Sequence, residues 1–179
     1  MIRRVRTFLR RWHGDQRGVS ALEFALIAPF MVSLYLGAVE VSLALSIDRK
    51  ITSAASALAD LVAQDDVITD GEMASIMTAG SAIVAPFDTA PLEVRISSVM
   101  MDSSGDVSVQ WSDADGMPPL TEGGSVSMPA GVMQTNRSVI MVEVSYSYET
   151  MFSELGMSKF DIREVFYLRP RRSLLVMRD

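Results

Sequence analysis

Glu23 is the side chain whose chemistry most needs an explanation, because it stands at the start of a strongly apolar segment. It lies five residues after Gly18, and no charged residue lies between the two. A carboxylate costs about 3 kcal/mol at the centre of a membrane helix and less near its boundary, and such residues usually mark function. The dipole of a helix that begins near Val19 also favours an acid in its first turns. An assembly role and a tolerated interfacial acid are therefore both open for Glu23.

The residue types that enzymes use most are scarce in this chain. Its single histidine is His13, in the N-terminal leader, and cysteine is absent. A histidine-based triad, a cysteine nucleophile and a histidine metal cluster are therefore excluded from the rest of the chain. No Gly-x-Ser-x-Gly, P-loop or Gly-x-Gly-x-x-Gly pattern is present. Since scattered acids alone specify no catalytic site, we expect a protein that is not an enzyme and needs no cofactor.

Asp113-Ala114-Asp115-Gly116 has the oxygen ligands that Ca²⁺ prefers. A calcium loop has glycine at position six and a bidentate acid at position twelve, whereas here Gly116 is the fourth residue and Gly124 the twelfth. We therefore interpret this stretch as a turn and expect no metal ion. Asn136-Arg137-Ser138 fits the glycosylation pattern, which is too short to carry weight alone.

Residues 24–47, FALIAPFMVSLYLGAVEVSLALSI, are long and apolar enough to cross a membrane once, and Glu40 is their one charged side chain. As a helix they would reach roughly 36 Å, more than the hydrocarbon core of about 30 Å. This apolar core is too long for an ordinary cleaved secretory signal, and the nearest small-residue site, Ala55-Ser56-Ala57, lies well beyond it. We predict a single-pass membrane protein.

Charge is divided unevenly about this segment. Before Val19 there are six arginines and one acid, so the chain's 16 basic and 22 acidic residues leave 10 and 21 for the remainder, a net charge of −11. The positive-inside rule therefore puts the N-terminus in the cytoplasm and the acidic C-terminal part outside, periplasmic or extracellular. An acidic body also argues against nucleic acid as a partner, because phosphate binding needs a basic surface.

After the apolar segment the spacing stays helical, with no glycine or proline to break it, so we predict one helix from about Val19 to Gln64. Its second half is one-sided and must pack on a domain or another subunit. The apolar stripe comprises Ile51, Ala54, Ala55, Leu58, Leu61 and Val62.

Residues 65–179 combine helical and strand patterns and predict a small extracytoplasmic α+β domain with an antiparallel sheet. Thr69-Asp70-Gly71-Glu72 resembles a helix start, and Pro86 ends that helix. Period-two patterns predict strands in four ranges, the first two as a hairpin: 92–96, 107–111, 139–149 and 162–168. Residues 114–131 hold four glycines and three prolines, which indicates a long loop, either a surface insertion or a binding loop.

Five arginines make the C-terminus basic, and two readings of them are open. They could dock an acidic partner or lipid headgroups, or they could balance the acidic body, which we favour. These residues are Arg163, Arg169, Arg171, Arg172 and Arg178.

Arg17-Gly18-Val19-Ser20-Ala21-Leu22-Glu23-Phe24 resembles a type IV prepilin processing site, in which a basic leader ends in glycine and glutamate is the fifth mature residue. GVSALEFALIAPF is similar to the TadE-like pseudopilins of the tight-adherence (Flp) type IV pilus, with their Glu-Phe-Ala pattern and nearby Pro29. The similarity continues through Gly37, Glu40 and the alanine-rich helix, and in FYLRPR near the C-terminus. Residues 14–64 carry most of it, and the outer domain is similar mainly in layout.

The resemblance implies a leader of residues 1–18, removed by a prepilin peptidase that cuts between Gly18 and Val19. Glu23 would then neutralise the new amino group, its own or a neighbour's, in an apolar bundle where an unpaired amine is costly. Pro29 removes a backbone hydrogen bond and would permit a local kink. Phe24 belongs to the family pattern, and Glu40 is either an intersubunit contact or an interfacial acid.

These features together predict a minor pilin-like subunit of the bacterial inner membrane, held there before assembly into the pilus or its initiating complex. Its expected partners are the peptidase, other pilin and pseudopilin subunits, the inner-membrane assembly platform and the lipid bilayer. The alternative is a single-span scaffold protein of the assembly or secretion machinery whose leader is never removed. An anchored enzyme or solute-binding domain is a third, weaker hypothesis.

Overall fold

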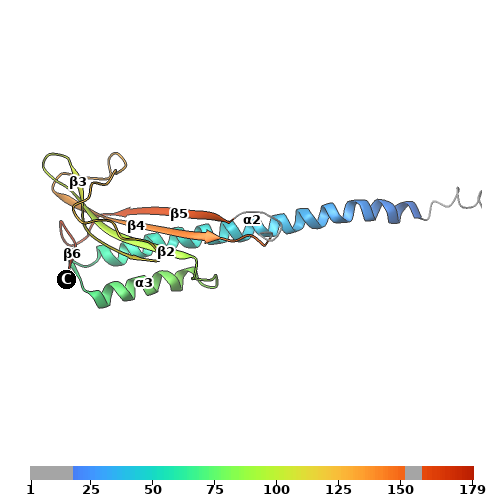
Figure 1. Ribbon diagram of the computed structural model, residues 1–179, viewed down its shortest axis with the longest axis horizontal. Helices are drawn as coiled ribbons and strands as arrows, with labels where there is room; N and C mark the ends of the chain where they lie inside the picture. The colour runs from blue at the N-terminus through green and yellow to red at the C-terminus, as the bar shows by residue number, and fades with distance from the viewer. Residues whose placement is uncertain (1–17, 152–158) are drawn as a thin grey trace, which may run out of the picture. The chain divides into compact units, whose positions relative to one another are not determined.

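The computed structural model describes residues 18–151 and 159–179 (Figure 1). The chain divides into two compact units, residues 1–42 and 43–179. The arginine-rich leader, with His13, lies outside the described residues except for Gly18.

Helix α2 runs from Val19 to Ala63, within one residue of the predicted range, and includes Pro29. Its second half packs on the domain, as predicted, through eight buried residues: Ile47, Ile51, Ala54, Ala55, Leu58, Ala59, Val62 and Ala63. The prediction was wrong for Leu61, whose side chain is 39% exposed. The buried stripe advances in steps of four residues and so winds around the helix, which leaves Leu61 outside and brings in Ala59 and Ala63.

Helix α3, Asp70–Val84, begins where the sequence predicts, because Thr69 and Glu72 form a capping box. The backbone N–H of Thr69 donates to Glu72 Oε2 at 2.9 Å, and that of Glu72 donates to Thr69 Oγ1 at 3.4 Å. The hydrogen bond from the Thr69 backbone lowers the pKa of Glu72 below its usual value. At the other end, Lys50 Nζ of α2 donates to the carbonyl of Ile83 at 2.9 Å and so ties the two helices together.

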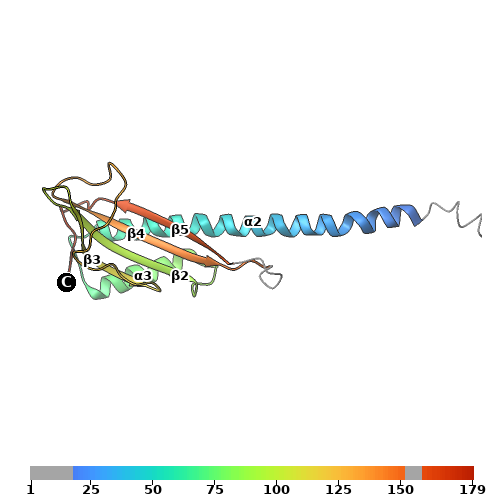
Figure 2. The ribbon, with the colours of Figure 1, turned by 45° about the horizontal axis from the view of Figure 1, so that its top comes forward.

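Four antiparallel strands form the main sheet, in the order β3-β2-β4-β5 (Figure 2). They are β2 (Leu92–Met101), β3 (Val107–Asp115), β4 (Arg137–Tyr148) and β5 (Phe160–Leu168). All four predicted strands are thus confirmed, and each is longer in total than its predicted range, although β4 ends one residue earlier than predicted. One face of the sheet joins α2 and α3 in the main core, to which the sheet contributes Val94, Ile96, Trp111, Ile140, Val142, Val144, Tyr146 and Tyr148.

A parallel pair of two-residue strands, β1 (Val67–Ile68) and β6 (Met177–Arg178), joins the segment after α2 to the C-terminus. The sequence does not predict this pair, because two residues are too few to show a period. Strand β6 belongs to a C-terminal strap, which we define as residues 169–179. Within the strap, the backbone N–H of Arg171 donates a hydrogen bond to the Ala63 carbonyl at 2.9 Å. The Val176 carbonyl accepts a hydrogen bond from Trp111 Nε1 at 2.7 Å.

The glycine- and proline-rich segment is a loop from Gly116 onward, whereas its first two predicted residues, Ala114 and Asp115, continue β3. The loop lies on the sheet face opposite the helices. There it covers a second, smaller core of Val99, Val109 and Val139. The loop side chains packed against these valines are Leu120, Val126, Met128, Val132 and Met133. The N–H of Gly123 donates to the Val109 carbonyl at 2.9 Å, so part of the loop also closes the outer edge of β3.

The prediction of a turn over Asp113-Ala114-Asp115-Gly116 was wrong for its first three residues. They belong to β3, because the pairing with β2 continues as far as Val94 opposite Asp115. The chain turns only at Gly116, whose φ of +77° and close approach to the Leu92 carbonyl require a glycine.

Candidate assembly surface

The first half of α2 exposes large apolar side chains all around its circumference. Eleven of them, between residues 19 and 41, are 48–80% exposed: Val19, Leu22, Phe24, Leu26, Ile27, Phe30, Met31, Val32, Leu34, Tyr35 and Val41. The most apolar 18-residue window of the helix has a mean hydropathy of 1.9, and none of it is buried. A helix that is apolar all around and uncovered needs an apolar environment, which lipid or other helices can provide.

Gly18 and Val19 lie at the N-terminal end of this helix, and both are exposed. A Cβ atom placed on Gly18 would meet no other atom within 4 Å, and the same is true of Gly37. By contrast, a Cβ on Gly80 would lie 3.1 Å from Leu58 Cδ1, so packing requires glycine there. Nothing in the described fold requires glycine at position 18.

Glu23 is exposed and forms no side-chain hydrogen bond or ion pair with the described residues. It follows Val19 by four residues, so the two lie on one face of α2, about 6 Å apart along the axis. Helical side chains lean toward the N-terminus, which directs the Glu23 carboxylate back toward the backbone nitrogen of Val19. An amino group at Val19 would therefore lie within reach of the carboxylate of its own chain.

The remaining predicted site residues are strung along the same helix and do not converge. Phe24 is 73% exposed beside Glu23. Pro29 is exposed, and its carbonyl accepts a hydrogen bond from Ser33 Oγ at 2.8 Å. Glu40 is half-buried and lies about 26 Å from Glu23 along the axis at 1.5 Å per residue. The arrangement is that of an extended packing surface, not of a pocket.

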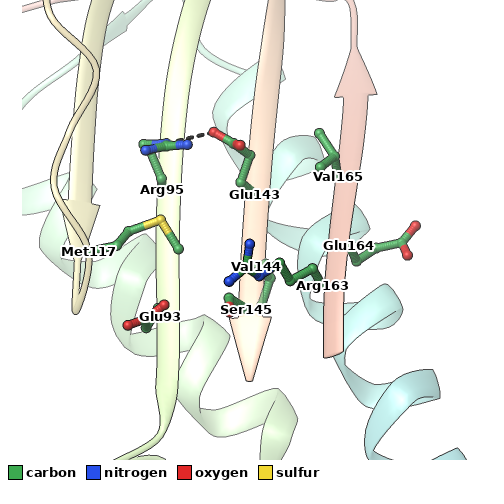
Figure 3. Close-up of a pocket in the computed structure, with 9 residues that line it drawn as sticks. All are labelled: Glu93, Arg95, Met117, Glu143, Val144, Ser145, Arg163, Glu164 and Val165. Carbon is green, nitrogen blue, oxygen red and sulfur yellow. Dashed lines mark hydrogen bonds and ion pairs between the residues drawn. The ribbon is translucent and has the colours of Figure 1, made fainter. Parts of the chain in front are cut away.

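A shallow groove of about 240 Å³ lies on the loop-covered side of the sheet, beyond the edge of the loop. Figure 3 shows Arg95 and Glu143 pointing toward each other across it, with Arg95 Nε donating to Glu143 Oε2 at 2.6 Å. Arg95 Nη1 also donates to the carbonyl of Pro118 at 3.1 Å, so the pair anchors the start of the loop. The sequence gives no sign of this groove, because it depends on the register of β2 and β4. Within residues 18–151 and 159–179 no cluster of three potential metal ligands occurs.

Three of the five C-terminal arginines pair with acids of the domain, as the charge-balance interpretation predicts. Arg163 binds Asp161 at 3.0 Å, and Arg171 binds Asp60 of α2. Arg178 is the most constrained of the three, since its guanidinium reaches two carboxylates and a backbone carbonyl. Hydrogen bonding to Asp113 is the main cause that raises the pKa of Arg178.

In a comparison with protein families, the family model "TadE-like protein" aligns with residues 18–60. The match begins at Gly18 and includes Glu23, Phe24, Pro29 and Glu40. Comparisons with curated proteins and with solved structures give no match.

Proposed function

We propose that this chain, whose residues 18–60 are TadE-like and thus mark a pilin-like protein associated with the tight-adherence pilus, is a minor pilin subunit cut after Gly18 by a prepilin peptidase. The observation that carries the proposal is the uncovered apolar helix, which begins at Val19 and has Gly18 and Glu23 at its N-terminal end. Its partners would be other pilus components, the assembly platform and the bilayer.

The two environments of this helix explain its composition. As a monomer it is held in the inner membrane, with the basic leader in the cytoplasm and the domain outside. In a filament the same apolar surface packs against the helices of neighbouring subunits, because both settings remove it from water. Pro29 is compatible with both, since it costs one backbone hydrogen bond and allows a local bend. Phe24 and Glu40 would face neighbours in the assembled state.

Processing changes the charge at the start of the helix. Cleavage removes the leader and leaves a positively charged amine on Val19, one helical turn from Glu23. A charge buried alone in an apolar bundle is expensive, so the amine and the carboxylate would enter the filament as a pair and help to fix the axial register. The pair can form within one chain or between neighbours.

Intact mass measurement of the membrane-extracted protein tests the cleavage. We expect the mature chain to begin at Val19 in a cell with an active peptidase, and Gly18→Ala to retain residues 1–18. Gly37→Ala is the matched control, because an added Cβ meets nothing within 4 Å at either glycine. A full-length chain in piliated cells would refute the cleavage and favour the scaffold hypothesis, in which the leader stays attached.

A second experiment tests the role of Glu23 separately. We expect Glu23→Ala to be processed normally and to impair pilus assembly, because the Val19 amine then lacks its partner. Glu23→Gln keeps the size of the side chain without its charge and should show the same defect. Normal piliation with both variants would remove the proposed role of Glu23 while leaving the cleavage intact.

A further inference from the structure

The outer end of the lipid-facing helix is determined by the domain. Leu43 and Ala44 pack partly buried against the main core, and Ile47 is 2% exposed. A side chain that faces the core cannot also face lipid, so the lipid-facing stretch would end at Ser42. Residues 24–42 span about 28 Å as a helix, close to the hydrocarbon thickness of about 30 Å. No apolar residues are left over to separate the domain from the bilayer.

One end of the domain lies level with Leu43. The Arg171 N–H bonds to the Ala63 carbonyl and so fixes the far end of β5 beside the C-terminus of α2. From Ala63 back to Leu43 the helix covers about 30 Å. From Leu168 back to Phe160, β5 covers about 26 Å. Figures 1 and 2 both show the start of β5 and the end of β4 beside α2, on the side away from Ala63.

This end of the domain exposes apolar side chains from three elements. Leu45 of α2 and Met151 after β4 are each 54% exposed, and Phe160 of β5 is 44% exposed. The Phe160 ring is held against Tyr148, with the ring centroids 5.2 Å apart. We call Leu45, Met151 and Phe160 the membrane-facing rim.

Two charged side chains beside the rim, both among the described residues, neutralise each other. Lys159 Nζ lies 3.1 Å from Glu149 Oε2, and both side chains are more than half exposed. Attraction to anionic lipid therefore adds little, and contact would come from burying apolar groups at the boundary between headgroups and acyl chains.

We propose that the membrane-facing rim rests in the interfacial layer of the bilayer from which α2 emerges. The proposal rests on the membrane-held monomer described above. The subunit is then held at two places, by its helix and by its domain, and its tilt is restricted before assembly. Extraction into a filament must release the rim from lipid as well as the helix.

The opposite end of the domain supplies a matched comparison. It also carries an exposed apolar side chain, Leu174, at 59%. Leu174 is held beside β4, since its carbonyl accepts a hydrogen bond from the Ser138 N–H at 3.0 Å, and Ser138 is at the strand end remote from Tyr148. Leu174 and Met151 have similar exposed fractions, but only Met151 lies at the end of the domain that we place in lipid.

The absence of cysteine makes site-specific labelling simple. Met151→Cys and Leu174→Cys, each carrying a nitroxide in the full-length chain, would be reconstituted into phosphatidylethanolamine–phosphatidylglycerol vesicles. Electron paramagnetic resonance would then measure collisions with oxygen, which concentrates in lipid, and with a water-soluble nickel chelate. We expect the nickel accessibility at Met151 to be several-fold lower than at Leu174, with a higher oxygen accessibility.

Equal accessibilities at the two positions, whether both high or both low, would overturn the proposal. Phe160→Cys provides a second rim position, so a local disturbance at one label cannot decide the result. The measurement does not depend on processing: a chain that fails to be cut after Gly18 can still show the rim in lipid. If the chain is cut and assembled but its rim is exposed to water, only the proposed contact between the rim and lipid is refuted, and the proposed cleavage stands.

Discussion

Arg178, the penultimate residue, holds the C-terminal strap to two other parts of the domain, and its removal should destabilise the whole domain. Its Nε donates to Asp113 Oδ2 of β3 at 2.9 Å, and its Nη2 donates to Asp70 Oδ1 at the start of α3 at 2.6 Å. Its Nη1 donates to the Ile68 carbonyl at 3.1 Å. One side chain thus joins the ends of β1, α3 and β3 to the strap.

The expected loss of unfolding free energy follows from how exposed the side chains of Arg178 and its partners are. The Arg178 side chain is 18% exposed and that of Asp113 is 30% exposed, so their contact is shielded from water. Hydrogen bonds to charged groups contribute about 1.5–3 kcal/mol when buried. Asp70 is 94% exposed, and such a pair contributes only about 0–1 kcal/mol. We therefore expect Arg178→Met to lower the free energy of unfolding by about 2–4 kcal/mol.

Urea unfolding of the detergent-solubilised full chain provides the assay. Trp111 is 5% exposed and bonds to the strap through the Val176 carbonyl, so its fluorescence reports the region directly. Trp12 would be replaced by phenylalanine in all variants to leave a single tryptophan. With a slope of about 2 kcal/mol per molar, the midpoint should fall by about 1–2 M urea.

A matched control and two further variants make this prediction refutable. Arg172 is exposed and has no hydrogen bond or ion pair among the described residues, so Arg172→Met should change stability by less than about 0.5 kcal/mol. Arg178→Lys should lie between wild type and Arg178→Met, because an ammonium cannot reproduce the guanidinium fork. Asp113→Asn should lose much of its effect when Arg178 is already replaced. Equal stabilities of the Arg178→Met and Arg172→Met proteins would refute the argument.

Three further predictions concern the domain interior. Ser98 is buried, and its Oγ has no hydrogen-bond partner among the described residues, whereas the Oγ of the equally buried Ser97 is 2.8 Å from Ser112 Oγ. In the same urea assay, Ser98→Ala should therefore be neutral or stabilising, and Ser97→Ala should be destabilising by about 1 kcal/mol. Because the folded-state pKa of Glu72 is lowered, its stabilising effect is present above its usual value of 4.5 and is lost as the pH falls through the lower folded value. The stability difference between wild type and Thr69→Ala should thus narrow below about pH 4.5, and an unchanged difference in melts across this range would contradict the capping box as its source. Gly80→Val should cost about 1–3 kcal/mol by overpacking against α2, and a melting temperature equal to that of wild type would show that the helices have room to separate.

The glycine- and proline-rich loop packs on the second core, which its composition alone does not indicate. Glycine and proline density predicted a loop correctly, because these residues disfavour regular elements. The second core under the loop depends instead on a register shift between β2 and β3, where Ser98 lies opposite Trp111 but Val99 lies opposite Val109. The extra residue in β3, Gln110, turns Val109 to the loop side, where Val99 and Val139 also lie. Its apolar side chains are part of a core, so the segment is anchored to the sheet whether it is a surface insertion or a binding loop.

What the sequence determined by itself was local. The extent of α2, the capping box at Thr69 and the alternation in four strands are periodic or short-range patterns, so they could be predicted without knowing any distant partner. The leader, Gly18 and Glu23 likewise stand within a few residues of one another, and the family match over residues 18–60 confirms the part of the resemblance that Gly18 and Glu23 carry. Such patterns can be recognised in the sequence because side chains on helices and strands repeat at fixed periods.

The tertiary structure decided every feature that depends on which distant surfaces meet. It excluded Leu61 from the core, paired β1 with β6 and joined Arg178 to Asp113, 65 residues away in the chain. It also placed the domain core against Leu43, inside the stretch that hydropathy alone assigned to lipid. Hydropathy measures how much a side chain avoids water, and it does not distinguish burial in a protein from burial in a bilayer; only the packed neighbours do.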